Sequence, residues 1–216
     1  RDQPRSRGLG DVYKRQPEGY ARNPEQVINF YNERRKQLLD VVPNAGHLGV
    51  ADLERDFNVT VVTQNVDNLH ERAGSTHVIH LHGELTKVCS SRDPYNPHFV
   101  KELAPEEYEV KLGDKAGDGT QLRPFIVWFG ESVPEIETAI RYVEQADIFV
   151  IIGTSLNVYP AAGLLNYVPR AAEVYLIDPK PVDTHVMRPI HVIQKGASEG
   201  VKELKALLTA TQPPLP

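Results

Sequence analysis

Cysteine is almost absent from this sequence. Cys89 is the only one among 216 residues, so no internal disulfide can form and no set of four thiolates can bind a zinc ion. A chain so poor in cysteine fits a reducing compartment, and we expect a cytoplasmic protein. An excess of positive charge is also missing: the net charge is −5, which disfavours nucleic acid and acidic membranes as partners. No apolar run approaches the ~20 residues that cross a bilayer.

The first sixteen residues, RDQPRSRGLGDVYKRQ, lack apolar periodicity of any kind. They contain five basic and two acidic residues and resemble translated adapter sequence. A disordered basic tail is the alternative interpretation, and in either case the segment is set aside when the fold is predicted. We therefore expect one folded domain at 17–210, preceded by a non-native segment at 1–16 and followed by a tail at 211–216.

Within the domain, apolar runs of strand length alternate with helical patterns. Asn23-Pro24-Glu25 is a typical helix start, with a capping side chain, proline in the first turn and an acid beside it. We predict helices at 24–40, 44–57, 134–146, 160–168 and 198–209, and strands at 59–65, 76–83, 124–131, 147–155, 173–179 and 190–198. This alternation predicts an α/β fold with a doubly wound, Rossmann-like parallel sheet. Residues 84–123 lose periodicity and are predicted to form a small loop-rich lobe.

Ligands of open parallel sheets bind outside the carboxyl ends of the strands. One predicted strand ends in Gly153-Thr154-Ser155, where glycine allows close approach and the hydroxyls and amides suit a phosphate. Asp178 ends the next strand, 25 residues later, as does the acid that binds a ribose hydroxyl in dinucleotide-binding folds. The chain has no full GxGxxG motif, so a plain strand-to-loop turn at Gly153 is the alternative.

The segment VIHLHGEL contains two histidines, His80 and His82, one residue apart. On a strand both would share a face. They could bind a metal together with Asp67 or His77, but the ligand spacing matches no structural zinc site. Alternatively, one histidine could act as a base near neutral pH, or both could fill the core. His82 lies beside Gly83 at the polar end, which favours it as the base.

Five segments occur in the order and spacing of the sirtuins, which this chain resembles. They are TQNVDNLHERAG, VIHLHGEL, FIVWFGE, IIGTSLNVYPAAGL and LID. The resemblance runs from about Pro17 to Leu208 and is strongest to the bacterial NAD-dependent protein deacylases. It implies NAD as the cofactor and acyl-lysine proteins or peptides as substrates.

The resemblance also implies a role for each matched residue. His82 corresponds to the catalytic base, which deprotonates a ribose hydroxyl of NAD, and His80 is left as packing. Asn65 and Asp67 join His82 as catalytic residues and, with Gln64, shape the nicotinamide and ribose pocket. The implied cofactor contacts are Gly153, Thr154, Ser155, Asp178 (Asn in many members) and Ala197. The implied contacts to an extended acyl-lysine peptide, by β-augmentation, are Val127, Phe129, Gly130, Glu131, Asn157 and Tyr159.

In the implied reaction the acyl amide oxygen attacks the ribose carbon as nicotinamide leaves, inside a water-poor tunnel. His82 then drives the ribose hydroxyl onto the resulting imidate, and the products are lysine, nicotinamide and O-acyl-ADP-ribose. A mono-ADP-ribosyltransferase and a non-catalytic NAD or ADP-ribose sensor are the rival functions. The presence of His82 together with Asn65 and Asp67 argues against the sensor, which needs no base.

Tyr31 and Arg34 lie one helical turn apart on the predicted helix 24–40. Without the family, a solvated charged face would be the favoured interpretation of this segment. The pair matches the Tyr-x-x-Arg of sirtuins that accept succinyl and other acidic acyl groups. The resemblance therefore implies desuccinylation besides deacetylation, with the guanidinium and the phenol binding the acyl carboxylate.

Two family features are missing from the printed chain. Most sirtuins hold the small lobe together with zinc bound by four cysteines, whereas 84–123 contains only Cys89. We expect this lobe to fold without zinc, through Leu85, Val88, Phe99, Leu103, Tyr108, Val110 and Leu112. The Gly-Ala-Gly turn that presents amides to the NAD diphosphate is also missing. We therefore expect the chain as printed to be an inactive fragment that a homologous segment in place of 1–16 would restore.

Overall fold

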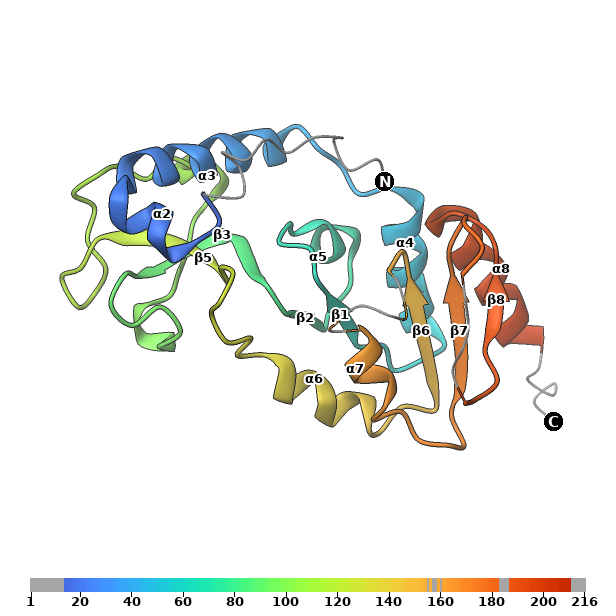
Figure 1. The fold of residues 1–216 in the computed structure, drawn as a ribbon. Coiled ribbons are helices and arrows are strands. Elements are labelled where there is room, and N and C mark those ends of the chain that lie inside the picture. Colours follow the sequence, from blue (N-terminus) through green and yellow to red (C-terminus); the bar gives the residue numbers. More distant parts are fainter. Residues whose placement is uncertain (1–13, 155, 157–158, 160, 183–186, 211–216) are drawn as a thin grey trace. The chain divides into compact units, whose positions relative to one another are not determined.

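The computed structural model describes residues 14–154, 156, 159, 161–182 and 187–210 (Figure 1). Its contacts divide these residues into two compact units. Unit 1 holds 14–42, 63–68 and 80–134, and unit 2 holds the described residues of 43–62, 69–79 and 135–210. None of the described helices is both long enough and apolar enough to cross a membrane.

Unit 1 is built from two helices and an antiparallel sheet. Helix α2 spans Pro17–Arg22 and α3 spans Pro24–Leu39. The predicted start of α3 is confirmed, because the Asn23 side chain accepts a hydrogen bond from the Gln26 amide at 3.1 Å. The sheet has the order β4-β3-β5, with β3 at Gly83–Ser90, β4 at Lys101–Glu102 and β5 at Leu122–Ile126. Helix α3 packs on β3 and β5, with Val27, Tyr31, Leu85, Ile126 and Trp128 between them.

The small lobe is more ordered than its sequence pattern indicates. Residues 83–90 form the strand β3, and the loops beyond it contain the short helices η2 (Pro97–Phe99) and η3 (Pro105–Glu107). Two side chains of α3 hold a distant loop of the lobe. Asn32 exchanges two hydrogen bonds with the Val110 backbone, at 2.7 and 2.9 Å, and Arg35 donates to the Tyr108 carbonyl at 2.8 Å. These polar contacts supplement the apolar packing that the sequence predicts.

The predicted apolar contacts of the lobe are only partly correct. Leu85, Val88 and Val110 are buried, and Leu103 packs against this core. Leu112 is instead 56% exposed, because it lies in the turn that follows Val110 and faces solvent. Cys89 is fully buried beside β5, and burial raises the pKa of its thiol to about 12. The protonated thiol therefore behaves here as a small apolar side chain.

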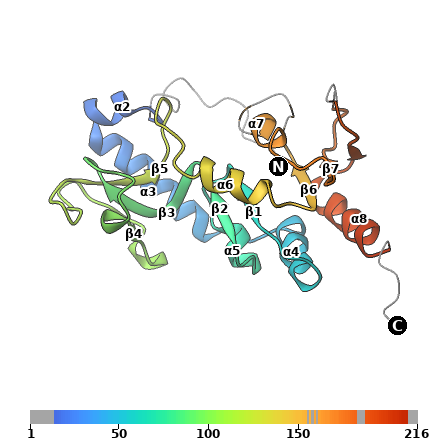
Figure 2. The same cartoon turned by 90° about the horizontal axis from the view of Figure 1, so that it is seen from below.

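Unit 2 contains a three-stranded parallel sheet, which confirms the α/β class. The order is β6-β7-β8, with β6 at Ile148–Ile152, β7 at Glu173–Ile177 and β8 at His191–Ile193. Helix α7 (Ala161–Leu165) lies between β6 and β7 in the chain, and α8 (Ala197–Ala210) follows β8. In Figure 2, α7 and α8 lie on opposite sides of the sheet, as in a doubly wound fold.

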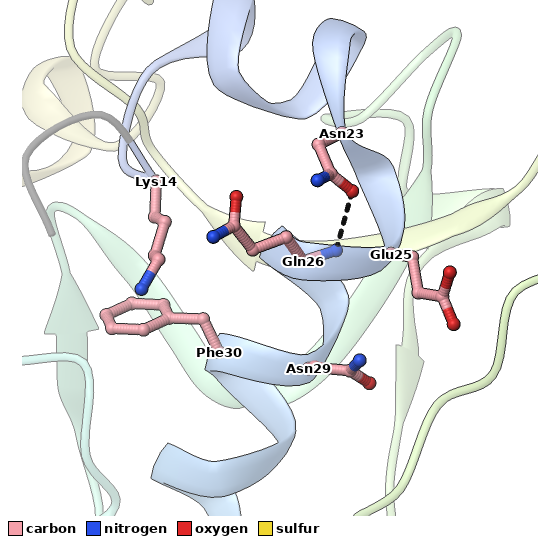
Figure 3. A pocket seen from close by; sticks show the side chains of 6 residues that line it. All are labelled: Lys14, Asn23, Glu25, Gln26, Asn29 and Phe30. Atoms are coloured by element: carbon pink, nitrogen blue, oxygen red, sulfur yellow. Dashed lines mark hydrogen bonds between the residues drawn. The ribbon is translucent and has the colours of Figure 1, made fainter. Parts of the chain in front are cut away.

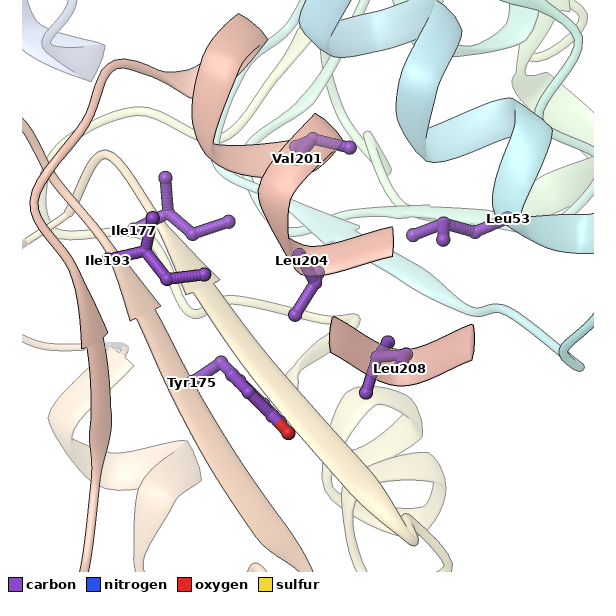
Figure 4. Close-up of a cluster of buried hydrophobic side chains, with 7 residues drawn as sticks. All are labelled: Leu53, Tyr175, Ile177, Ile193, Val201, Leu204 and Leu208. Carbon is purple, nitrogen blue, oxygen red and sulfur yellow. The ribbon is translucent and has the colours of Figure 1, made fainter. Parts of the chain in front are cut away.

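The core of unit 2 forms where α8 packs on the sheet and on α4 (Ala45–Asp52). Figure 4 shows its seven side chains, which are Leu53, Tyr175, Ile177, Ile193, Val201, Leu204 and Leu208. Unit 2 also contains η1 (Leu53–Arg55), α5 (Leu69–Ala73) and α6 (Ile136–Val143). The apolar run of β6 predicts a strand buried on both faces, but only Ile151 is buried, because β6 is an edge strand among the described residues.

The strands are not joined into one sheet. β1 (Val61–Thr63) and β2 (Val78–His80) form a two-stranded sheet of their own. The predicted strand at 124–131 is wrong over its second half: β5 ends at Ile126, and residues 128–131 form a turn closed by the Glu131 amide on the Trp128 carbonyl. His82 is not on a strand either, because β2 ends at His80 and β3 begins at Gly83.

Ser90 is expected to be a major polar contact of the small lobe. Its buried hydroxyl donates to Asp118 at 2.5 Å and accepts from the amides of Arg92 and Asp93 at 3.1 and 3.0 Å. Ser90→Ala should lower the free energy of unfolding by about 0.5–1.5 kcal/mol, because three hydrogen bonds of a fully buried hydroxyl are lost. The effect is no larger because Arg92 and Asp93 are exposed and Asp118 is half-buried, so water can replace part of these bonds. Urea denaturation measures the change. The exposed Ser132→Ala is the matched control, and equal stability of both variants would contradict the assignment.

Candidate active site

In unit 1, the loop that follows β1 is bonded directly to the turn that follows β2. The Leu81 amide donates to the Thr63 carbonyl at 3.0 Å, and the Leu85 amide donates to the Val66 carbonyl at 2.7 Å. The Thr63 hydroxyl also accepts a hydrogen bond from the Asn65 amide at 3.0 Å. Two of the sequence motifs, TQNVD and LHGEL, are thereby held against each other.

His80 is packed in the interior, as predicted, and it also makes a hydrogen bond that the sequence did not indicate. It is buried, and its Nδ1 lies 3.0 Å from the Asn65 carbonyl oxygen. Because a carbonyl only accepts, Nδ1 must carry the proton in this contact. The Glu84 carboxylate lies 3.8 Å from the other ring nitrogen. His80 therefore fixes the backbone at Asn65, one of the predicted catalytic residues.

His82 lies in the turn between β2 and β3, half-buried. Burial lowers the pKa of its imidazole below the usual value, although a hydrogen bond to the Gln64 backbone acts in the opposite direction. The ring is thus neutral at physiological pH, which is the form that accepts a proton. Its backbone is fixed as well, because the Val127 amide donates to the His82 carbonyl at 2.9 Å.

Gly83 is the residue that allows this turn. Its φ is +85°, a conformation that side chains with a Cβ rarely adopt, and an added Cβ would lie 2.1 Å from the Phe125 carbonyl oxygen. A glycine is therefore required immediately after His82 for β3 to approach β5.

The other predicted catalytic residues lie in the loop that His80 and Thr63 hold. Gln64 and Asn65 are exposed, and Asp67 is half-buried. The structure thus brings Gln64, Asn65 and Asp67 together with His82 within unit 1, as the motif spacing predicts.

The predicted cofactor residues gather at the carboxyl edge of the parallel sheet in unit 2. Gly153 follows β6 with φ +68° and nothing within 4 Å of the place of a Cβ, so a ligand could approach its backbone closely. Asp178 follows β7, where its carboxylate accepts from the Lys180 amide at 2.8 Å, and the exposed Ala197 begins α8. Thr154 is half-buried beside Gly153, whereas Ser155 lies outside the described residues. An approachable backbone, a hydroxyl and a carboxylate fit a phosphorylated ribose.

Tyr31 and Arg34 occupy different environments on α3. Tyr31 is only 3% exposed, and its hydroxyl accepts a hydrogen bond from the Trp128 indole N–H at 3.1 Å. Burial raises the pKa of this phenol, while the charges of Arg15, Arg34 and Arg123 lower it, and burial dominates. Arg34 is half-buried, with its guanidinium 5.6 Å from the centre of the Phe30 ring. The surroundings of the Tyr31 hydroxyl are therefore positively charged.

The predicted peptide contacts lie mainly in a turn rather than on a strand. Phe129 is 65% exposed, Gly130 has φ +86°, and the Phe129 amide is bonded to the Arg15 carbonyl at 3.2 Å. Val127 is half-buried, and its amide is engaged by His82. In unit 2, Tyr159 is 60% exposed, and Asn157 lies outside the described residues.

The side chain of Glu131 belongs to a network that the sequence motifs did not identify. Arg123 is buried and donates to both carboxylate oxygens of Glu131, at 3.1 and 3.2 Å. The same carboxylate accepts from the Trp128 amide at 2.8 Å and from the Tyr95 hydroxyl at 2.9 Å. The Arg123 guanidinium also lies 3.8 Å from the centre of the Trp128 ring. The single tryptophan within FIVWFGE was the only feature of the sequence that could have pointed to this network.

A shallow depression at the start of α3 contains none of the predicted site residues. It has a volume of about 440 Å³ and is lined by Lys14, Asn23, Glu25, Gln26, Asn29 and Phe30. Figure 3 shows the Lys14 ammonium over the Phe30 ring, 5.1 Å from its centre. Four of these residues are exposed, so the depression is an open surface and does not indicate an active site.

Comparison with known proteins agrees with these motifs. A relative from Bacteroides thetaiotaomicron, named NAD-dependent protein deacylase, is 79% identical over 205 residues, which cover 93% of this chain and 88% of the relative. A solved Sir2 homologue–NAD complex has a TM-score of 0.76 at 34% identity, covering 93% of this chain and 78% of that one. A Sir2–p53 peptide–NAD⁺ structure has a TM-score of 0.72 at 25% identity, covering 98% of this chain and 87% of that one. The Sir2 family model matches residues 10–160, and the chain therefore belongs to the Sir2 family.

Proposed function

We propose that this protein is an NAD-dependent protein-lysine deacylase. One observation carries the proposal: the half-buried His82 is held in a turn that is bonded to the Gln64–Asp67 loop. The Bacteroides thetaiotaomicron relative bears the name of this activity, and the solved homologues contain NAD and, in one case, a peptide. The products are the free lysine, nicotinamide and the O-acyl ester of ADP-ribose.

When bound, NAD supplies an electrophilic ribose carbon whose nicotinamide is a good leaving group. The residues of this chain bind and orient the reactants. In unit 2, the Gly153 backbone and the Thr154 hydroxyl would contact phosphate, and the Asp178 carboxylate would accept from a ribose hydroxyl. In unit 1, the Gln64–Asp67 loop would hold the nicotinamide and its ribose.

His82 acts as the general base in this proposal. Neutral imidazole accepts the proton of a ribose hydroxyl. The hydroxyl oxygen can then form an ester bond with the acyl carbon, and the lysine amine leaves. Partial burial supports this role, because it lowers the pKa of the imidazole and so favours the unprotonated form. His80 contributes indirectly, by holding the Asn65 backbone in place.

We further propose that Arg34 selects acidic acyl groups such as succinyl. Arg34→Met should lower kcat/KM for a succinyl-lysine peptide roughly 10- to 100-fold, because hydrogen bonds to a charged group contribute about 1.5–3 kcal/mol. The same substitution should change kcat/KM for an acetyl-lysine peptide less than about twofold, since acetyl has no carboxylate to lose this contact. Nicotinamide release measures both.

Two variants on the same helix sharpen this test. Lys36→Met removes an exposed positive charge two residues away and should leave both substrates unaffected. Arg34→Lys keeps the positive charge but cannot bind a carboxylate bidentately, so an intermediate loss of kcat/KM for the succinyl peptide is expected. If Arg34→Met lowers kcat/KM equally for the succinyl and acetyl peptides, Arg34 does not select acidic acyl groups.

The assays compare the printed chain with the same chain bearing a relative's N-terminal segment in place of residues 1–16. Nicotinamide release is measured for both forms with NAD and an acyl-lysine peptide. Nicotinamide release that requires an acyl-lysine peptide supports the deacylase. Release with another acceptor would indicate ADP-ribosyltransfer, and NAD binding without release would indicate a sensor.

A further inference from the structure

The only tryptophan of the chain, Trp128, donates its indole N–H to the hydroxyl of Tyr31 at 3.1 Å. Both side chains are almost fully buried, at 2% and 3% exposed, and they lie 97 residues apart in the sequence. A phenol oxygen that accepts one hydrogen bond still has its own proton to donate. The contact therefore determines the direction in which Tyr31 can donate.

Trp128 cannot easily turn away from this contact. Its ring is stacked under the Arg123 guanidinium, 3.8 Å from the ring centre, and its backbone amide donates to Glu131 at 2.8 Å. Glu131 in turn holds Arg123 through two hydrogen bonds, and Arg123 also donates to the Ile126 carbonyl at 2.8 Å. Both the ring and the backbone of Trp128 are thus fixed by one ion pair.

The Tyr31 hydroxyl is suited to donate to an anion. Burial keeps the phenol protonated, and Arg15, Arg34 and Arg123 lie within electrostatic reach of it. A donor whose oxygen already accepts a hydrogen bond is polarised and donates more strongly. An acyl carboxylate at Arg34 would lie one helical turn from this donor.

We propose that Trp128, fixed by the Arg123–Glu131 pair, is a positioning residue that orients the Tyr31 hydroxyl and so sets the preference for acidic acyl groups. The inference rests on the proposed function, because it requires that Tyr31 and Arg34 bind an acyl carboxylate. It extends the determinant of acyl specificity from α3 to Trp128 in the turn after β5, where the neighbouring residues are predicted to contact the peptide.

Trp128→Phe tests the inference, because phenylalanine keeps an aromatic ring under Arg123 but removes the N–H donor. Calorimetry uses whichever of the two assayed forms releases nicotinamide, here called the starting protein. It should show about 3- to 10-fold weaker binding of a succinyl-lysine peptide and unchanged binding of an acetyl-lysine peptide. Tyr31→Phe should cause a similar selective loss. In the double variant the loss should not exceed that of Tyr31→Phe alone, because both changes interrupt one chain of contacts.

A second measurement does not depend on how well Trp128→Phe folds. Since Trp128 is the sole tryptophan, its fluorescence reports the Tyr31 contact directly. The succinyl-lysine peptide should shift the emission of the starting protein, and it should shift it far less in Tyr31→Phe.

The outcomes separate this inference from the proposed function. Equal losses of binding affinity for the succinyl and acetyl peptides would overturn the positioning role. So would additive losses of affinity in the double variant, or an unaltered succinyl preference in Trp128→Phe. If the starting protein binds neither peptide, the proposed function fails and the inference fails with it. A selective loss together with a non-additive double variant supports the inference.

Discussion

Replacement of His82 by alanine should lower the deacylation rate roughly 100- to 10,000-fold, the range typical of removing a general base. His82→Tyr should have a comparable effect, since a phenol in this position is not a base near neutral pH. The fold should persist in both variants, because His82 is only half-buried and its backbone carbonyl, not its ring, is bonded to Val127. Nicotinamide release with an acyl-lysine peptide measures the rate, and circular dichroism measures the fold.

The pH dependence of the unsubstituted enzyme gives an independent check. A base acts only when deprotonated, so kcat/KM should fall as the pH drops through the pKa of His82. Because burial lowers that pKa, the acid limb should lie below the usual histidine value of ~6.5. The exposed His98→Ala is the matched control and should leave the profile unchanged. Activity of His82→Ala within a few-fold of the starting protein would exclude His82 as the base.

Glu131→Gln should destabilise the protein by about 3 kcal/mol. It removes one charge of a buried pair and leaves the Arg123 guanidinium, whose side chain is 5% exposed, without its counter-ion. Trp128 and Tyr95 lose part of the same acceptor. Urea denaturation at neutral pH measures the difference. Glu106→Gln, on an exposed side chain, should change the free energy of unfolding by less than about 0.5 kcal/mol.

The difference should also depend on pH in a defined direction. Burial raises the pKa of the Glu131 carboxyl, but the hydrogen bond and charge of Arg123 and the Trp128 amide outweigh it, so the folded-state pKa is lowered. The pair therefore stabilises the fold fully above the unfolded value of ~4.3, and this stabilisation is lost as the pH falls through the folded-state pKa. Equal stability of Glu131→Gln and the starting protein at neutral pH would show that the pair contributes nothing net.

Local signals explain what could be predicted from the sequence. The cap at Asn23 and the apolar periodicity behind it identified α3, and the continuous apolar runs identified β6 and β7. Glycine beside His82 marked a turn that only a residue without Cβ can form. These features depend on interactions within a few residues, so a single sequence contains them.

Contacts between distant segments were decided only by the tertiary structure. Sequence pattern extended the strand after Arg123 to Glu131, but the carboxylate of Glu131 folds back onto Arg123 and the Trp128 amide, which forces a turn. The burial of His80 agrees with its predicted packing, but its hydrogen bond to the Asn65 carbonyl depends on how the fold brings these two residues together. Composition and motifs by themselves determined the family, the α/β class and His82 as the candidate base. Which side chains hold that base and orient Tyr31 depended on tertiary contacts, because a buried polar group is stabilised by whichever partner the fold places against it.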